Sequence, residues 1–320
     1  MNRTAVRLGV LLLAAVAVGA VLLALLPPSS TGTYGEEGAR SSAVAVKKLG
    51  ERDHELTVTS AALGREGKVR VLLPEGWTPG SGPWPVLYLL NGCCQPDYDT
   101  WITEGGATEL TSGYRALVVV PEAGTVGFYS DWREGPGWET FHLTEVRAVL
   151  ERDYGAGDRR AVAGLSMGGF GAMSYAARHP GMFQAAASFS GVLHTREGHG
   201  GVDWLLSRYG EKSVKLWGPP QDPEWAAHNP ADLTGALRGV RLFVSSGDGA
   251  PGPLDDASGA RDDSEASLLL QAVTFVERAK ANGVEVTIDF YGPGTHSWPY
   301  WRRGLERSLP MLMSSIGAAP

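Results

Sequence analysis

The stretch between Arg160 and His179 constrains the fold most, because it reads as a buried strand, a sharp turn and a helix. An apolar run leads into Gly164-Leu165-Ser166-Met167-Gly168, which has the form G-x-S-x-G, and a small-residue helical pattern follows. A bare match could arise by chance among 43 glycines, but the strand before and the helix after are the context that the motif requires. Glycines flank such a serine because larger side chains would collide with the neighbouring strand or helix. We therefore predict that Ser166 is a nucleophile, held at the top of a sheet above the first amides of a helix.

Strand-like and helical segments alternate along the rest of the chain. Apolar and β-branched runs bounded by Pro and Gly predict strands, at residues 68–74, 85–91, 116–122, 185–191, 240–248 and 284–291. Helical spacing is present at residues 138–153, 264–282 and 300–316. This order predicts an α/β fold with a doubly wound, mostly parallel sheet, whose loops gather at the strand carboxyl ends near Ser166. Residues 194–232 are too irregular for a sheet, and we interpret them as a small cap inserted beside the active site.

The N-terminus carries an export element. Arg3 and Arg7 precede the uncharged apolar residues 8–26, and Pro27 ends the pattern. The run is long for a signal-peptide core and about long enough to span a bilayer, so for residues 1–28 a cleaved signal peptide and a membrane anchor both stay open. We interpret residues 29–50 as a flexible linker and expect the folded domain at residues 51–318. The expected location is extracytoplasmic, either secreted or anchored at the outer face of the membrane, which an uncleaved segment would contact.

Composition narrows the class of protein. A chain of 320 residues with 43% hydrophobic and 20% charged residues is ordinary for a globular protein with a core. The net charge of −7 and the absence of a Lys/Arg-rich run argue against a nucleic-acid partner. Nothing in the sequence demands a partner chain, so a monomer is expected.

The residues that could activate the serine lie downstream. Of seven histidines, only His296 lies between the last strand pattern and the last helix, which gives the order Ser, acid, His expected of an α/β-hydrolase. An imidazole there can take the proton from Ser166 and return it to a leaving group. The residues alone leave the acid open: Asp248 follows the strand that usually delivers it, and Glu265 begins the next helix.

Cys93 and Cys94 are the only cysteines. Adjacent cysteines seldom form a disulfide, because the eight-membered ring strains the peptide between them, so we predict two free thiols even in an oxidising compartment. A zinc site or a cysteine nucleophile would need further ligands or partners that the sequence does not offer. We expect no metal and no cofactor.

Several strings resemble the antigen 85 mycolyltransferases, within the wider esterase D group of α/β-hydrolases, over about residues 56–316. They are L-L-N-G at 89–92, F-Y-S-D-W at 128–132, W-E-T-F at 138–141, L-W-G-P at 216–219 and G-T-H-S-W-P-Y-W at 294–301. The resemblance implies an α/β-hydrolase fold, Ser166 as nucleophile, His296 as base and Glu265, rather than Asp248, as the acid. It also implies an oxyanion hole made by the backbone amides of Met167 and Cys93.

The departures from this family lie in one loop. Asn91 and Cys94 stand where the family has an aspartate and an arginine that bind the trehalose acceptor. A thiol cannot replace a guanidinium as a multiple hydrogen-bond donor, so the acceptor site is expected to differ. With Trp298, these two residues are our candidates for contact with substrate.

The resemblance implies an exported serine esterase or acyltransferase that acts on lipid or cell-envelope esters through an acyl-enzyme. Its partners would be an acyl ester or lipid substrate and an alcohol or sugar acceptor, or water. One alternative is an esterase D type carboxylester or thioester hydrolase. A second is a catalytically silent envelope-binding protein on the same fold.

Overall fold

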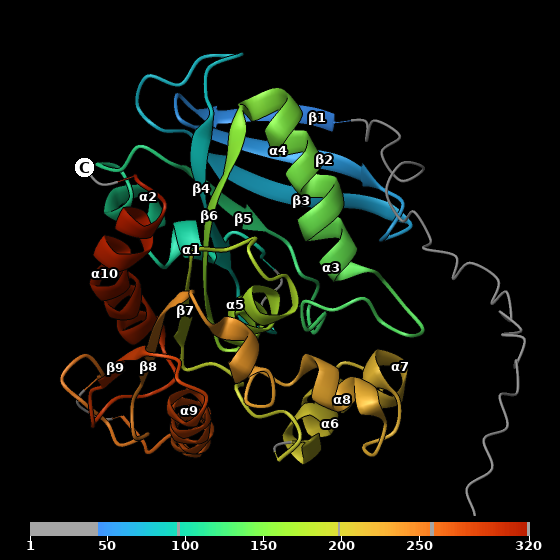
Figure 1. Cartoon of the computed structure of the whole chain (residues 1–320), viewed down its shortest axis with the longest axis vertical. Helices are drawn as coiled ribbons and strands as arrows, with labels where there is room; N and C mark the ends of the chain where they lie inside the picture. Colours follow the sequence, from blue (N-terminus) through green and yellow to red (C-terminus); the bar gives the residue numbers. More distant parts are fainter. Residues whose placement is uncertain (1–43, 95–96, 198, 257–258, 319–320) are drawn as a thin grey trace, which may run out of the picture. The chain divides into compact units, whose positions relative to one another are not determined.

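The structure is a computed structural model that describes residues 44–318 except 95–96, 198 and 257–258. These residues form a nine-stranded sheet in the order β1-β2-β3-β5-β4-β6-β7-β8-β9 (Figure 1). The strands are β1 (Val44–Gly50), β2 (Asp53–Ser60), β3 (Arg65–Leu72), β4 (Trp84–Leu90), β5 (Leu117–Pro121), β6 (Ala156–Leu165), β7 (Ala185–Phe189), β8 (Arg241–Ser246) and β9 (Val286–Phe290). β1, β2, β3 and β5 pair antiparallel, and every pair from β5 to β9 is parallel. The predicted α/β sheet is thus confirmed.

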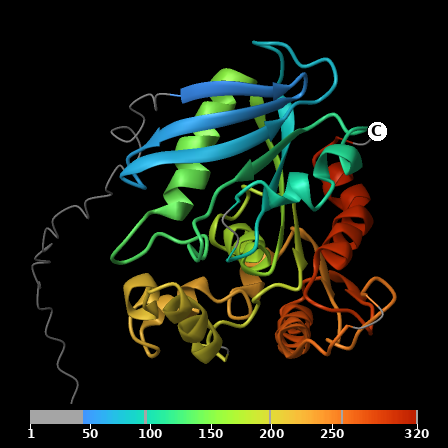
Figure 2. The ribbon, with the colours of Figure 1, turned by 180° about the vertical axis from the view of Figure 1, so that it is seen from behind.

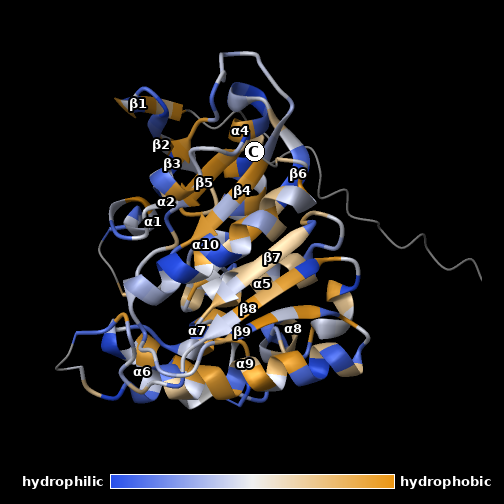
Figure 3. Cartoon of the chain, turned by 90° about the vertical axis from the view of Figure 1, so that its left-hand side faces the viewer, coloured by the Kyte–Doolittle hydropathy of each residue, from blue (hydrophilic) through white to orange (hydrophobic). Residues whose placement is uncertain are grey.

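Helices cover both faces of the central strands, so every residue of β4, β5 and β7 is buried. One core cluster packs the sheet against α3 (Trp138–Thr140), η1 (Phe141–Val146), α4 (Arg147–Tyr154), α5 (Met167–Arg178) and α9 (Asp263–Ala281). The other packs it against α1 (Thr100–Thr103), α2 (Ala107–Leu110) and α10 (Trp298–Ser315) (Figure 2). In Figure 3, hydrophobic residues accordingly lie mainly on the central strands, while the outer helices carry hydrophilic residues on part of their surface.

The position of β1 shows that the predicted linker was wrong at its carboxyl-terminal end. Residues 29–50 were expected to be flexible, but Val44–Gly50 forms β1 and pairs antiparallel with β2. β1 is mostly exposed and β2 buries only alternate residues, among them Leu56 and Val58. Such strands are stabilised by pairing with a neighbour more than by their own apolar content, which explains why the sequence pattern missed them.

Among its described residues, the predicted cap over residues 194–232 consists of short helices and loops with no strand. The helices are α6 (His199–Arg208), α7 (Ser213–Trp217) and α8 (Pro223–His228), and η2 (Thr234–Leu237) follows them. Trp217 packs this segment against the body of the domain. The centroid of its ring lies 5.5 Å from that of Phe170 in α5 and 5.7 Å from that of Phe128. The cap therefore packs against the first turn of the helix that follows Ser166.

The predicted signal peptide or anchor, residues 1–28, lies outside the described residues. In the part of the chain that the structure describes, no helix is long and apolar enough to cross a membrane.

Candidate active site

Ser166 lies at the junction of β6 and α5 with φ 51° and ψ −118°, a conformation that a residue with a side chain rarely adopts. The glycines of the motif permit this turn. A Cβ on Gly164 would come within 2.2 Å of the Gly168 carbonyl oxygen, and a Cβ on Gly168 within 2.2 Å of the Leu90 carbonyl oxygen. The backbone around Ser166 thus leaves no room for a side chain at either glycine of the G-x-S-x-G motif, as the spacing predicted.

The loops after β4 and β7 hold the serine from either side. The Ser166 amide donates to the Phe189 carbonyl at 2.9 Å, and the Val192 amide donates to the Ser166 carbonyl at 3.3 Å. On the other side, a Cβ placed on Gly92 would lie 3.5 Å from the Ser166 Cβ. The carboxyl ends of three neighbouring parallel strands therefore meet around the candidate nucleophile.

His296 follows β9, and its Nδ1 lies 2.8 Å from Oε2 of Glu265. Glu265 is in the first turn of α9 and is fully buried. The N-cap residue of that helix, Asp262, connects the two: one carboxylate oxygen accepts from the Glu265 amide at 3.2 Å, and the other accepts from the His296 amide at 3.0 Å. Glu265, and not Asp248, is therefore the carboxylate beside the histidine; Asp248 Oδ1 instead accepts from the Ala250 amide at 2.8 Å.

Two serines that the sequence analysis missed satisfy the second oxygen of this carboxylate. Oε1 of Glu265 accepts from the hydroxyls of Ser190 and Ser246, each at 2.8 Å, and from the Gly247 amide at 2.7 Å. A buried charge needs such donors, because its lost hydration would otherwise be strongly unfavourable. Ser190 directly follows β7 and Ser246 is the last residue of β8, and this position at the carboxyl edge of the sheet was the signal that could have identified the two serines.

The amides of Met167 and Cys93 are the candidates for the oxyanion hole. Met167 is the first residue of α5, and Cys93 lies in the loop after β4. Among the described residues, neither amide donates a hydrogen bond to the protein, so both are free to donate to a substrate oxygen. The next amide, that of Cys94, is occupied by the Thr125 carbonyl at 2.9 Å.

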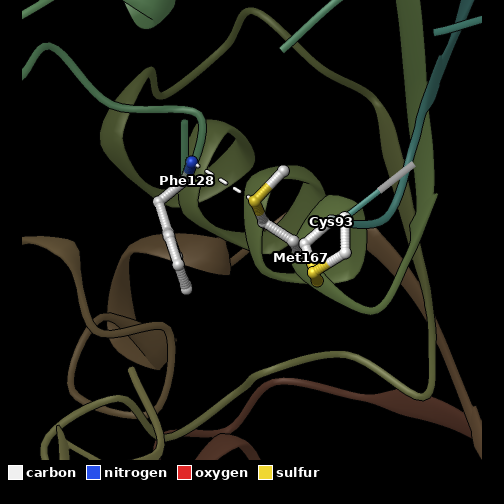
Figure 4. The surroundings of a disulfide bond; sticks show 4 residues. Cys93, Phe128 and Met167 are labelled. Carbon is white, nitrogen blue, oxygen red and sulfur yellow. Dashed lines mark hydrogen bonds between the residues drawn. A yellow bond between two sulfur atoms is a disulfide. The ribbon is translucent and has the colours of Figure 1, made fainter. Parts of the chain in front are cut away.

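The prediction of two free thiols was wrong, because Cys93 and Cys94 form a disulfide (Figure 4). Free thiols would be expected if the backbone at these two cysteines had ordinary dihedral angles. Cys94 instead has a φ of 75°, in the left-handed region, and this sharp turn brings the two sulfurs together.

Asn91 and Trp298, two of the residues predicted to contact substrate, contact other residues of the protein. The buried Asn91 donates through Nδ2 to the Tyr98 carbonyl, and its Oδ1 accepts from the Thr100 hydroxyl at 2.9 Å. Trp298 packs edge-on against Trp101 and Trp301, at centroid distances of 5.4 and 5.2 Å. Their contact with a substrate stays a prediction.

A pocket of about 210 Å³ adjoins the loop after β4. Its lining is mostly polar and includes Asn91, Gly92, Tyr98, Glu122 and Thr125. A larger pocket of about 610 Å³ is lined by Arg241 and Val286, at the amino ends of β8 and β9, and is therefore at the opposite edge of the sheet from Ser166. The described residues contain no group of His, Cys, Asp and Glu arranged to hold a metal ion.

A serine in a strained turn between a parallel strand and a helix, with a paired histidine and carboxylate beyond the later strands, defines the α/β-hydrolase class. A family model named Esterase matches residues 60–312, and the chain belongs to this esterase family.

The chain is similar in sequence to antigen 85 proteins, the family that its sequence strings resemble. It is 32% identical to the diacylglycerol acyltransferase/mycolyltransferase Ag85B of Mycobacterium intracellulare, with 94% of both chains covered. It is 31% identical to Ag85A of Mycobacterium tuberculosis, over 95% of this chain and 92% of the relative. The chain is thus an enzyme of the acyltransferase and ester hydrolase type.

Solved structures share the fold of this chain. The structure of Mycobacterium tuberculosis MPT51 (FbpC1) matches with a TM-score of 0.71 and 26% identity, over 86% of this chain and 100% of that one. An S-formylglutathione hydrolase from Agrobacterium tumefaciens matches with a TM-score of 0.68, over 86% of this chain and 99% of that one, at 18% identity. The second likeness shows the fold alone.

Proposed function

We propose that this chain is an exported serine enzyme that takes an acyl group from a lipid or cell-envelope ester and passes it to an alcohol or to water. The observation that carries the proposal is the 2.8 Å contact of His296 Nδ1 with the buried Glu265, together with Ser166 in its strained turn. The names of the relatives, diacylglycerol acyltransferase/mycolyltransferase, support a lipid acyl donor. The apolar residues 8–26 support export.

The first half-reaction forms the acyl-enzyme. Because Nδ1 of His296 is engaged by Glu265, Nε2 is the ring atom left to take the proton from the Ser166 hydroxyl. The serine oxygen attacks the ester carbonyl, and the amides of Met167 and Cys93 donate to the negative oxygen that develops. His296 then returns the proton to the departing alcohol, and Glu265 stabilises the imidazolium in between.

The second half-reaction releases the acyl group. An alcohol or water loses a proton to His296 and attacks the acyl-enzyme, and the proton returns to Ser166 as the new ester or acid leaves. We propose the 210 Å³ pocket beside Asn91 as the place of a small alcohol acceptor, because its polar lining adjoins the oxyanion loop. Trehalose recognition by the family's aspartate and arginine is not expected, since Asn91 is bonded inside the loop and Cys94 is in a disulfide.

The first test compares the full-length protein with Ser166→Ala on a short-chain p-nitrophenyl ester. We expect the substitution to lower kcat at least about 10³-fold, because the remaining site cannot form an acyl-enzyme. Glycerol added as a competing acceptor separates the two outcomes of the second step: acylated glycerol among the products identifies a transferase, and free acid alone a hydrolase.

Two alternatives predict other results. A faster turnover of S-acyl thioesters than of oxygen esters would favour an esterase D type thioester hydrolase. If wild type and Ser166→Ala were equally inert on short and long acyl chains, and a serine-reactive phosphonate failed to label Ser166, the silent envelope-binding protein would replace our proposal.

A further inference from the structure

The disulfide closes a ring around the peptide bond that directly follows the candidate oxyanion donor. The ring contains the Cα, Cβ and Sγ atoms of Cys93 and Cys94 and the peptide bond between them, so it restricts rotation on the carbonyl side of Cys93. The amide of Cys93 is attached to a ring atom. The orientation of that amide therefore depends on how the ring is held in the protein.

The ring is fixed at both of its ends. On one side, the Cys94 amide donates to the Thr125 carbonyl at 2.9 Å, which connects the ring to the turn after β5. On the other side, Gly92 packs so closely on the carboxyl end of β6 that an added Cβ would lie 2.5 Å from Cδ1 of Leu165, the last residue of that strand. The Cys93 amide lies between these two fixed points.

The backbone at this place would not keep its shape easily without the disulfide. Cys94 has a φ of 75°, which a residue with a Cβ adopts rarely unless its surroundings impose it. With two free thiols, the peptide after Cys93 could rotate toward ordinary values of φ. That rotation would move Cα of Cys93, to which its amide is attached.

The disulfide also lies beside the second candidate donor. Figure 4 shows it next to Met167, whose Sδ accepts from the Phe128 amide at 3.4 Å. Cys93 packs against the core cluster that contains both Met167 and Phe128. Both candidate oxyanion donors, Met167 and Cys93, thus belong to residues at the border of the same core cluster.

We propose that the Cys93–Cys94 disulfide is a positioning element of the oxyanion hole, and that Cys94 acts on the reaction through Cys93 as a positioning residue. This inference rests on the proposed function, since it takes the Cys93 amide as an oxyanion donor. Reduction of the disulfide would lower turnover while substrate binding stays nearly unchanged, because the oxyanion develops only in the transition state.

The test uses the full-length protein and a water-soluble phosphine as the reductant. The phosphine breaks the disulfide, is oxidised to the phosphine oxide with an oxygen atom from water, and leaves two thiols. A thiol reductant is avoided, because it could itself accept the acyl group. Both cysteines are partly exposed, so the reagent can reach them, and a mass gain of two hydrogens verifies the reduction.

We expect reduction to lower kcat on a p-nitrophenyl ester about 10-fold or more, below the 10²–10³-fold loss of a whole oxyanion donor, with little change in KM. The affinity for a trifluoromethyl ketone, which forms a tetrahedral adduct, should fall in parallel. Reoxidation with oxidised glutathione should restore both. A thermal unfolding scan of the reduced protein separates this effect from loss of the fold.

Two double variants extend the test. Cys93→Ser with Cys94→Ser should have the low kcat of the reduced enzyme and should not respond to phosphine. The kcat of Cys93→Ser with Cys94→Gly should lie between those of that variant and wild type. Glycine adopts a positive φ without penalty, but the constraint of the ring is still missing.

The outcomes separate this inference from the function on which it rests. If oxidised wild type and Ser166→Ala are equally inactive, the proposed function itself fails. If the oxidised enzyme is active through Ser166 and reduction leaves both kcat and the ketone affinity within two-fold, the positioning role of the disulfide is wrong while the function stands.

Discussion

At the scale of single residues, the site depends on a carboxylate that is buried and still fully hydrogen-bonded. Glu265 accepts from His296 with one oxygen and from two serine hydroxyls and the Gly247 amide with the other. These contacts fix both the position of the carboxylate and the ring orientation of the histidine. A neutral side chain of the same size would keep much of the packing but not the charge.

Glu265→Gln therefore tests the acid directly. We expect kcat to fall by about 10²–10⁴-fold, because an amide cannot stabilise the imidazolium and can favour the wrong histidine tautomer. Steady-state kinetics on a p-nitrophenyl ester would measure it, with a thermal scan to verify folding. Asp248→Asn is the matched control and should leave kcat within about two-fold. The opposite ranking of the two variants would return the role of acid to Asp248.

At the scale of elements, the amino end of α9 holds Glu265 and His296, two catalytic candidates from different parts of the chain, next to each other. The Asp262 carboxylate caps the helix through the Ser264 and Glu265 amides and also receives the His296 amide. Burial by itself would raise the pKa of Asp262, but the hydrogen bonds from Ser264, His296 and Glu265 lower it overall. The helix end and the histidine loop are thus joined by one charged group.

Asp262→Ala should destabilise the protein by about 0.5–2 kcal/mol at pH 7, the usual loss for an N-cap, and should also lower kcat because the His296 loop loses its anchor. The pKa of Asp262 is lower in the folded state, so its stabilising effect is present above the ordinary value of 3.8 and is lost as pH falls through the folded value. Steady-state kinetics on a p-nitrophenyl ester at pH 7 measure the loss of kcat, and urea unfolding at pH 7 and pH 3 checks the two statements on stability. A difference in unfolding free energy that grew toward pH 3 would contradict them.

At the scale of the whole molecule, one buried imidazole joins η1, α5 and the loop that follows β5. His142 is fully buried, with Nε2 2.7 Å from the Glu122 carbonyl oxygen and Nδ1 2.8 Å from the Tyr175 hydroxyl. Burial lowers the pKa of His142 to about 4. Neutral His142 is therefore part of the folded core, and its protonation opposes folding.

The stability of the domain should fall as pH drops from about 6.5 toward 4, because the unfolded chain binds a proton in that range that folded His142 does not. The loss attributable to this residue is of the order of 3 kcal/mol, at about 1.36 kcal/mol per pKa unit. Denaturant unfolding of wild type and His142→Gln at pH 7 and pH 4 measures it. The variant should be less stable at pH 7 but less sensitive to acid; equal slopes would disprove the role of His142.

The sequence by itself determined the parts of this protein that depend on short-range pattern. The alternation of buried runs with helical spacing indicated the parallel sheet, and the glycines around Ser166 indicated a turn that only small residues permit. The position of His296 after the last strand pattern followed from chain order. Glu265 came from the family resemblance, since the residues alone did not separate it from Asp248.

The tertiary structure decided what depends on contacts between distant residues. β1 and β2 exist because each pairs with a neighbour, and Ser190 and Ser246 reach Glu265 only because β7, β8 and α9 are packed together. The disulfide and the positive φ at Cys94 occur together, in a loop that the Thr125 contact and the packing of Gly92 tie to the sheet. Local preference argues against that backbone conformation, and the disulfide together with these contacts to distant residues maintains it.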